Sequence, residues 1–405
     1  MNGADTSSVR IVDLTDPDLW RQPGAWFAPW FRDGVRSGLV SATNSVMLIG
    51  HADVRDALCD PRLGAMGTRA FEAMGWSDGP FVEWMRRNIV AVDPPAHTRL
   101  RALVNRAFTP RRVAELAPLA REIGNQLADA MAEGREVDFY DAFAQRLPLN
   151  LICSMLAIPG IDHDRMQEWT AAINLATGIP RPTARAAADA AVEGIVDYVN
   201  GLIIERRKSP GEDLLSALIQ AQEDGESLSA EELPVMVIQL LVAGHETTRN
   251  LIGNGLFTLL RHPDQLRRLR RDPSVIPNAV EEIIRFEPSL IWVARVAHED
   301  LELGGAAVKP DQLVMLNLAA ANRDPTVHPD PERFNVGRRN IQVLSFGFGA
   351  HFCIGANLAR LEGRIAFEVL LDRFSKIEFI GEPPRFAAYT ALRTLESLHV
   401  RVTSS

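Results

Sequence analysis

A cysteine in a glycine-rich loop is the residue of this sequence whose setting best suits it to chemistry. Cys353 stands in the run Phe346-Gly-Phe-Gly-Ala-His-Phe-Cys-Ile-Gly355, whose three glycines let the backbone turn tightly and approach a flat ligand closely. The cysteine comes just before an expected helix start, where free N–H groups and the helix dipole favour a thiolate over a thiol. Such a thiolate is a strong axial ligand for haem iron. We therefore predict that Cys353 is the ligand of a haem iron.

A second run with chemical potential, Ala243-Gly-His-Glu-Thr-Thr248, lies inside the longest predicted helix. Glycine in a helix interior lowers stability by about 0.5–1 kcal/mol relative to alanine, so the presence of Gly244 requires an explanation. Thr247 can donate a hydrogen bond to the carbonyl of Ala243, which would bend or widen the helix and leave a notch for a diatomic ligand. Glu246, beside that hydroxyl and linked to solvent, could relay protons. Glu246 and Thr247 are therefore predicted to be catalytic.

Basic side chains are expected around the same ligand. His97 and Arg101 are four residues apart and so share one face of a predicted helix. Arg295 lies in an apolar, strand-like run, where a charge without a partner would be costly. His351 stands two residues before the cysteine. These groups suit a haem, because its two propionates must be neutralised or solvated when the cofactor is buried.

These runs resemble the motifs of the cytochrome P450 family, the haem–thiolate monooxygenases, in its soluble bacterial form, and the resemblance covers nearly the whole chain. The cysteine loop is similar to the family's haem-binding signature, the run 243–248 to its Ala-Gly-x-Glu/Asp-Thr motif, and Glu282-Ile-Ile-Arg285 to its Glu-x-x-Arg pair. The resemblance implies that Arg333 braces this pair. It also implies haem b as the cofactor, lying between the long central helix and the helix after the cysteine loop. The haem contacts that it implies are His97, Arg101, Ala243, Gly244, Arg295, Phe346, Gly347, His351 and Cys353.

The resemblance implies a monooxygenase that inserts one atom of O2 into a small molecule, by hydroxylation or epoxidation. In the family the threonine holds the oxygen bound at the iron and the neighbouring acid helps to bring protons in, roles that fall to Thr247 and Glu246. The chain has no flavin- or nicotinamide-binding segment and no iron–sulfur cysteine cluster. We therefore expect electrons from separate proteins, a ferredoxin and an NAD(P)H-linked ferredoxin reductase.

Two other functions stay open at this point. One is a haem–thiolate peroxygenase that takes its oxygen from hydrogen peroxide, although members of that branch lack the acid–threonine pair found here as Glu246 and Thr247. The other is a haem sensor or carrier without enzymatic activity.

A cluster of arginines is expected on the side of the haem that bears the thiolate. Cations there would steer an acidic ferredoxin, and salt would weaken the steering. The alternative is that these arginines pair with local acids such as Glu115 and Glu362. The arginines concerned are Arg106, Arg111, Arg112, Arg360 and Arg364.

The expected substrate wall is mostly apolar, which favours a lipophilic substrate. Residues four, five and eight positions before Thr247 share its helix face. In the strand-like run, alternation turns every second residue to the side of Arg295. One further residue is taken from the family's substrate-contacting loop near the C-terminus. The candidates are Gln239, Val242, Ala243, Ile291, Val293 and Tyr389.

Composition excludes several classes of protein. The chain has 405 residues, and its 43 Lys and Arg against 52 Asp and Glu give a net charge of −9, which argues against a general nucleic-acid binder. Three cysteines are too few for a disulfide scaffold. Neither a signal peptide nor an apolar run of membrane-spanning length is apparent, so we expect a cytoplasmic protein with no membrane partner.

The fold class predicted is mainly α with small β-sheets, in the cytochrome P450 fold, as a single domain over residues 1–405. A helix over 231–261 that is apolar on most sides must lie inside the protein, and Ser229 with Glu232 is expected to cap it. Helices are predicted at 113–131, 185–206, 214–222, 231–261, 264–269, 277–286 and 354–374, and strand-like runs at 39–49, 295–303 and 308–316.

Overall fold

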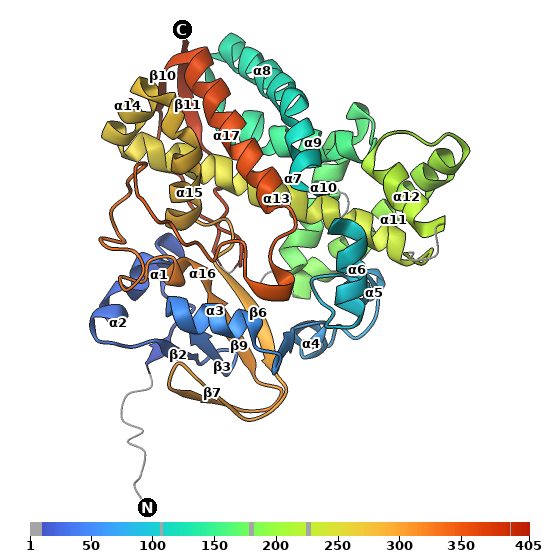
Figure 1. Cartoon of the computed structure of the whole chain (residues 1–405), viewed down its shortest axis with the longest axis vertical. Coiled ribbons are helices and arrows are strands. Elements are labelled where there is room, and N and C mark those ends of the chain that lie inside the picture. Colours follow the sequence, from blue (N-terminus) through green and yellow to red (C-terminus); the bar gives the residue numbers. More distant parts are fainter. Residues whose placement is uncertain (1–9, 106–107, 178–181, 224–227, 389) are drawn as a thin grey trace, which may run out of the picture.

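A computed structural model describes residues 10–105, 108–177, 182–223, 228–388 and 390–405. Figure 1 shows a helical part around α13 and α17, and a part with most of the strands, where α1, α2 and α3 also lie. The helices are α1 (Pro17–Arg21), α2 (Ala28–Arg32), α3 (His51–Cys59), α4 (Arg69–Glu72), α5 (Pro80–Arg87), α6 (Ala96–Asn105), α7 (Pro110–Glu115), α8 (Ala117–Gly134), α9 (Arg146–Met155), α10 (His163–Thr177), α11 (Arg185–Lys208), α12 (Leu214–Glu223), α13 (Glu232–Arg261), α14 (Pro263–Arg271), α15 (Ile276–Phe286), α16 (Leu318–Ala321) and α17 (Ala356–Arg373).

The strands form small sheets beside the helices. One has six strands in the order β1-β2-β3-β9-β6-β4, one has three in the order β10-β11-β5, and β7 and β8 form a hairpin. This confirms the expected class, mainly α with small sheets. The strands are β1 (Ile11–Val12), β2 (Ser37–Val40), β3 (Ser45–Leu48), β4 (Leu63–Ala65), β5 (Glu136–Asp138), β6 (Trp292–Ala297), β7 (Leu301–Leu303), β8 (Ala306–Val308), β9 (Leu313–Asn317), β10 (Phe374–Phe379) and β11 (His399–Ser404).

The long central helix α13 has the predicted extent. Its N-terminus is closed by the expected capping box, since the Glu232 N–H donates to Ser229 Oγ at 3.1 Å and the Ser229 N–H donates to Glu232 Oε2 at 2.8 Å. The helix is buried on most sides and packs against α9, α11, α15 and α17. This position lets α13 form one wall of any site in the middle of the molecule.

Several predicted elements are divided in the structure. The helix expected over 113–131 is two helices, α7 and α8, because Pro118 has no N–H to continue the first one and instead opens the second. The run 39–49 is the antiparallel pair β2 and β3. The runs 295–303 and 308–316 become β6 to β9, with Gly304 and Gly305 at positive φ (56° and 80°) in the turn of the β7–β8 hairpin.

Within the described ranges, no helix combines the length and the apolar character needed to cross a bilayer.

Candidate active site

A cavity of about 530 Å³ lies between α13 and the loop that precedes α17. Cys353 lines it from the loop, and Thr247 and Glu246 line it from the helix. The structure therefore brings the two motifs, more than a hundred residues apart in sequence, to one space. Every residue expected to contact the cofactor lines this cavity: His97, Arg101, Ala243, Gly244, Arg295, Phe346, Gly347, His351 and Cys353.

The cysteine loop is held by its backbone. The Cys353 N–H donates to the carbonyl of Phe346 at 2.8 Å. Gly347 and Gly349 adopt φ values of 70° and 69°, which side chains with a Cβ rarely adopt. At Gly349 a Cβ would also lie 2.8 Å from the Sγ of Cys59 on α3. The glycines are thus required both by the turn and by the close approach of α3.

The thiol of Cys353 is not made acidic by the protein alone, contrary to the sequence expectation. Burial raises its pKa, against the backbone N–H of Gly355 and the charges of Arg101 and Arg360, which lower it. Desolvation of the buried thiol therefore outweighs these three groups. A bound metal cation would reverse this balance, because a coordinating thiol is deprotonated outright.

Two cations of the cavity, Arg295, which is buried, and Arg101, which is half-buried, form no ion pair within the described part of the chain, although the charge of Asp93 acts on Arg295. Arg295 is 8% exposed, and its Nη1 donates only to the carbonyl of Ala294, at 3.0 Å. Neither Arg295 nor Arg101 forms an ion pair among the described residues. Burial lowers the pKa of both guanidinium groups, which is the cost of holding a charge there unpaired. The site fits a group with two carboxylates, as haem has.

Two imidazoles lie beside these arginines. The rings of His97 and His351 are 4.0 Å apart between centroids. Burial and the nearby positive charges lower the pKa of His97, and they lower that of His351 to about 4. Both rings are therefore neutral at pH 7, and each can still donate one N–H to a carboxylate.

The acid–threonine run lies on the wall opposite the cysteine loop. Thr247 Oγ1 donates to the carbonyl of Ala243 at 2.9 Å, as expected. At Gly244 a Cβ would lie 3.1 Å from Cγ1 of Ile152, so the glycine admits the close approach of α9. The close packing of α9 therefore explains why a glycine, which is costly inside a helix, stands at position 244.

Glu246 has partners that the sequence did not suggest. It is 3% exposed rather than linked to solvent. Its Oε2 accepts a charge-assisted hydrogen bond from Arg249, and its Oε1 lies 3.5 Å from Nε2 of His245. Burial alone would raise the pKa of Glu246, but the adjacent imidazole of His245 and the charge of Arg249 outweigh it and lower the pKa. The carboxylate is thus ionised and held.

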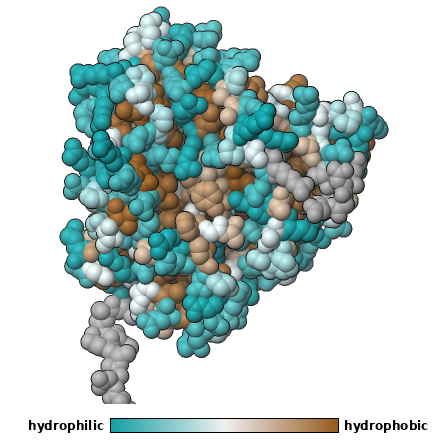
Figure 2. Space-filling model, in the orientation of Figure 1, coloured by the Kyte–Doolittle hydropathy of each residue, from teal (hydrophilic) through white to brown (hydrophobic). Residues whose placement is uncertain are grey.

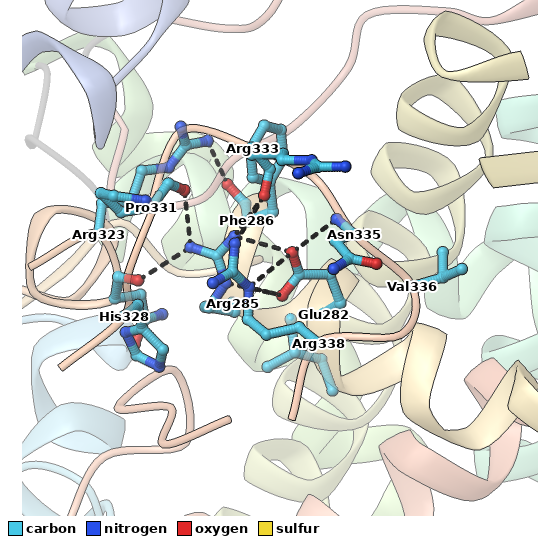
Figure 3. Close-up of polar contacts among 12 residues, drawn as sticks. Glu282, Arg285, Phe286, Arg323, His328, Pro331, Arg333, Asn335, Val336 and Arg338 are labelled. Atoms are coloured by element: carbon cyan, nitrogen blue, oxygen red, sulfur yellow. Dashed lines mark hydrogen bonds and ion pairs between the residues drawn. The ribbon is translucent and has the colours of Figure 1, made fainter. Parts of the chain in front are cut away.

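Behind the cavity, a buried ion pair fastens the segment that leads to the cysteine loop (Figure 3). Arg285 donates to Glu282 from Nε at 2.7 Å and from Nη2 at 2.9 Å, and both side chains are fully buried. Arg333 was expected to brace this pair, but Arg338 supplies the second guanidinium that binds Glu282. Its Nε lies 3.1 Å from both Glu282 carboxylate oxygens. Arg333 contributes its backbone carbonyl, which accepts from Arg338 Nη2 at 2.8 Å.

Most of the expected substrate wall lines the cavity, namely Gln239, Val242, Ala243 and Val293. Ile291 does not: it precedes β6, its backbone bonds to Ala391 and Leu318, and its side chain packs into the hydrophobic cluster under β3 and β9. Strand alternation does not reach a residue outside the strand. Tyr389 lies outside the described residues.

Three polar residues that sequence reasoning did not place in the cavity also line it: Asn88, Asn174 and Glu362. Glu362 is also the acid expected as an alternative partner of the arginines near the cysteine loop, but Arg360 and Arg364 pair with Glu281 and Glu368 instead. Asn88 directly follows α5 and Asn174 lies on α10, and no motif marks either. Glu362 is on α17; its Oε2 has no hydrogen-bond partner, and burial raises its pKa well above the ordinary value. The sequence signal that could have marked Glu362 is its acidic side chain at a position of the helix where the repeat predicts an apolar residue.

The outer face of the cysteine loop combines apolar and paired basic groups. Phe348 and Phe352 are 45% and 39% exposed. The side of the molecule drawn in Figure 2 has pale and brown residues near its middle, among teal ones. Arg111, Arg360 and Arg364 pair with Glu115, Glu281 and Glu368 at 3.2, 2.6 and 3.7 Å. Arg112 forms no ion pair within the described part of the chain, and Arg106 lies outside that part.

Comparison with known proteins yields consistent matches. A family model described as Cytochrome P450 matches residues 39–386. Cytochrome P450 107B1 of Saccharopolyspora erythraea is 40% identical over 374 residues, 89% of this chain and 90% of that protein. The vitamin D(3) 25-hydroxylase of Pseudonocardia autotrophica is 39% identical over 364 residues, 89% and 88% of the two chains. The structure of the cytochrome P450 enzyme CxnD for C–S bond formation in chuangxinmycin biosynthesis has a TM-score of 0.90 and 35% identity, and the match covers 99% of both chains.

Proposed function

The chain belongs to the cytochrome P450 family, and on that premise we propose which of its residues perform the family's reaction and with which partners. It is a haem–thiolate monooxygenase that acts on lipophilic small molecules with electrons from separate redox proteins. The reaction consumes substrate, O2, two electrons and two protons, and it yields the oxygenated product and water.

The cofactor that we propose is haem b, with Cys353 as its axial ligand. When bound, it supplies the iron at which O2 is activated. Arg101 and Arg295 would pair with its propionates, and His97 and His351 would each donate one hydrogen bond. The observation that carries this proposal is the pair of guanidinium groups that line the cavity and form no ion pair with any residue that the structure describes. Bidentate pairing with carboxylates offsets the cost of their desolvation.

Thr247 and Glu246 are proposed to handle the protons of the reaction. The Thr247 hydroxyl can turn from the Ala243 carbonyl toward the cavity and donate there. Glu246 can accept a proton and pass it on only after its carboxylate leaves Arg249, because the ion pair favours the ionised form. Proton entry through this acid therefore requires a rearrangement on α13.

The substrate is proposed to be lipophilic because the cavity wall is largely apolar. Leu240, Val242 and Val293 line it, and burying such side chains against a ligand contributes about 25 cal/mol per Å² of apolar surface. The name of the relative from Pseudonocardia autotrophica, a vitamin D(3) 25-hydroxylase, describes an enzyme with a lipophilic substrate.

The electron donor is proposed to be a ferredoxin, reduced by an NAD(P)H-linked reductase in the cytoplasm. Its docking face would be the outer side of the cysteine loop, where Phe348 and Phe352 are exposed. Arg112, on α7 beside α17, would meet an acidic surface. Because the other described arginines here pair with local acids, we expect apolar contact to contribute more than charge steering.

The test is turnover with a surrogate ferredoxin, its reductase, NAD(P)H and heavy-isotope O2. A monooxygenase places one heavy oxygen atom in the product, and product formation stops when the reductase is left out. Product formed only with hydrogen peroxide would indicate a peroxygenase. Haem binding without product from any substrate of a broad lipophilic panel would indicate a sensor or carrier.

A further inference from the structure

Two amide side chains interrupt the apolar wall of the cavity. Asn88, at the end of α5, and Gln239, on α13, are 0% and 9% exposed, and Asn88 Nδ2 donates to Gln239 Oε1 at 2.5 Å. Both residues line the cavity. Each donor and acceptor of an amide in such a setting needs a partner, because a buried polar group without one is destabilising.

A backbone bond fixes which way round each amide points. The N–H of Val90 donates to Asn88 Oδ1 at 3.1 Å, so this atom must be the oxygen. The other end of Asn88 is then the NH2 group, which must meet the oxygen of Gln239. Because the oxygen of the Gln239 amide is used in this bond, its NH2 group is the end left over. That NH2 group has no hydrogen-bond partner in the described ranges.

A third amide faces the same space from α10. Asn174 lines the cavity, and its Nδ2 is buried without a hydrogen-bond partner. Among the described residues, no hydrogen bond fixes the orientation of the Asn174 amide, so it can also turn an N–H to a ligand. Of these three amides, Gln239 therefore offers a donor group of fixed orientation, and Asn174 offers an amide that can turn either way.

We propose that Gln239, assisted by Asn174, binds a hydrogen-bond-accepting oxygen of the substrate. The proposal rests on the monooxygenase function proposed above and narrows its substrate to a lipophilic molecule that carries a ketone, ester or lactone carbonyl. Gln239 precedes Thr247 by eight residues, which is about 12 Å along an α-helix at 1.5 Å per residue. The oxidised carbon lies near Thr247, so the carbonyl lies about 12 Å from it, near the other end of the molecule.

A purely structural role for these amides gives a different expectation. The bond between Asn88 and Gln239 would then only fasten the end of α5 to α13. Removing it would lower stability and weaken all ligands alike. A recognition role predicts instead that the loss falls on ligands with the carbonyl.

The experiment compares matched ligands on the haem-bound protein. The probes form two pairs, and the second member of each pair carries no carbonyl. One pair is a steroid whose only carbonyl is a 3-oxo group and the same steroid with CH2 in its place, and the other is a macrolactone with no further carbonyl and the macrocyclic ether in which CH2 replaces the lactone carbonyl. Dissociation constants come from calorimetry. For at least one pair we expect the oxo member to bind wild-type protein about tenfold more tightly, as one buried hydrogen bond of about 1–1.5 kcal/mol provides. Gln239→Met should remove this preference, and Leu240→Met, in the same wall, should keep it.

A second measurement covers the case in which Gln239→Met does not fold. A crystal structure of wild-type protein with the oxo ligand that binds most tightly should show the carbonyl within hydrogen-bond distance of Gln239 Nε2. Equal dissociation constants within both pairs, no binding of either oxo compound, or a preference that survives Gln239→Met would overturn the proposal. None of these results touches the thiolate spectrum of the haem, so failure here is distinct from failure of the proposed function.

Discussion

Thr247 Oγ1 donates a hydrogen bond to the carbonyl oxygen of Ala243, 2.9 Å away and one helical turn earlier in α13. Both residues line the cavity that also holds Cys353. The bond keeps the hydroxyl at the cavity wall, and a small rotation about χ1 would free its proton for a ligand. The same hydroxyl thus forms a bond within α13 and can donate to a ligand in the cavity. Substitutions of Thr247 can separate these two roles.

Thr247→Ala should uncouple the reaction while leaving binding intact. The variant should bind haem and substrate, and NAD(P)H should still be consumed, but more of the electrons should appear in hydrogen peroxide and less in oxidised product. Thr247→Ser, which keeps a hydroxyl, should restore much of the coupling. The measurement is product and peroxide formed per NAD(P)H consumed. Unchanged coupling in Thr247→Ala would remove this residue from the catalytic set.

Glu246→Gln should slow turnover through proton entry. An amide cannot carry a proton as a carboxylate does, and Arg249 would lose its counter-ion. We expect turnover to fall about tenfold or more and the solvent isotope effect on it to change. Arg146→Gln, which breaks an exposed pair with Asp164, is the control for charge. A variant with wild-type turnover and isotope effect would argue against the relay.

Arg295→Leu should loosen the cofactor. The variant replaces a buried, unpaired guanidinium by an apolar group, so the polypeptide itself should not be destabilised, while a propionate loses its partner. We expect the rate of haem loss to rise about tenfold or more, since breaking such a charge-assisted bond costs about 1.5–3 kcal/mol. Arg99→Leu, whose arginine pairs with Glu232 instead, should lose haem at the wild-type rate. Equal rates in the two variants would contradict the assignment.

His328 should make stability depend on pH. Burial, chiefly, lowers its pKa from 6.5 to about 4. Between these values the unfolded chain binds a proton that the folded chain does not, so the free energy of unfolding falls as pH falls from about 6.5 to about 4. His328→Gln can still accept the N–H of Gln342. Its free energy of unfolding should fall less over that range, by about 1–3 kcal/mol. Identical slopes in urea titrations would refute the assignment.

The parts of this site that follow from the sequence are those whose residues stand close together in the chain. The cysteine loop and the run around Thr247 each carry their geometry locally, in glycines and in spacings of four residues. The residues that were missed or misplaced depend on distant partners. The bond between Asn88 and Gln239 joins residues 151 apart, and only the folded chain could assign Arg338 to Glu282 in place of Arg333. Ile291 was misplaced because strand β6 begins one residue later.

Ligation by Cys353 is the central claim, and the absorption spectrum of the reduced protein with carbon monoxide tests it most directly. Thiolate ligation gives the long-wavelength band for which the family is named, and neutral ligation does not. We expect that band in wild-type protein and its loss in Cys353→His, whereas Cys59→Ser and Cys153→Ser should keep it. Active wild-type protein without the band, or a Cys353→His variant that retains it, would contradict the account.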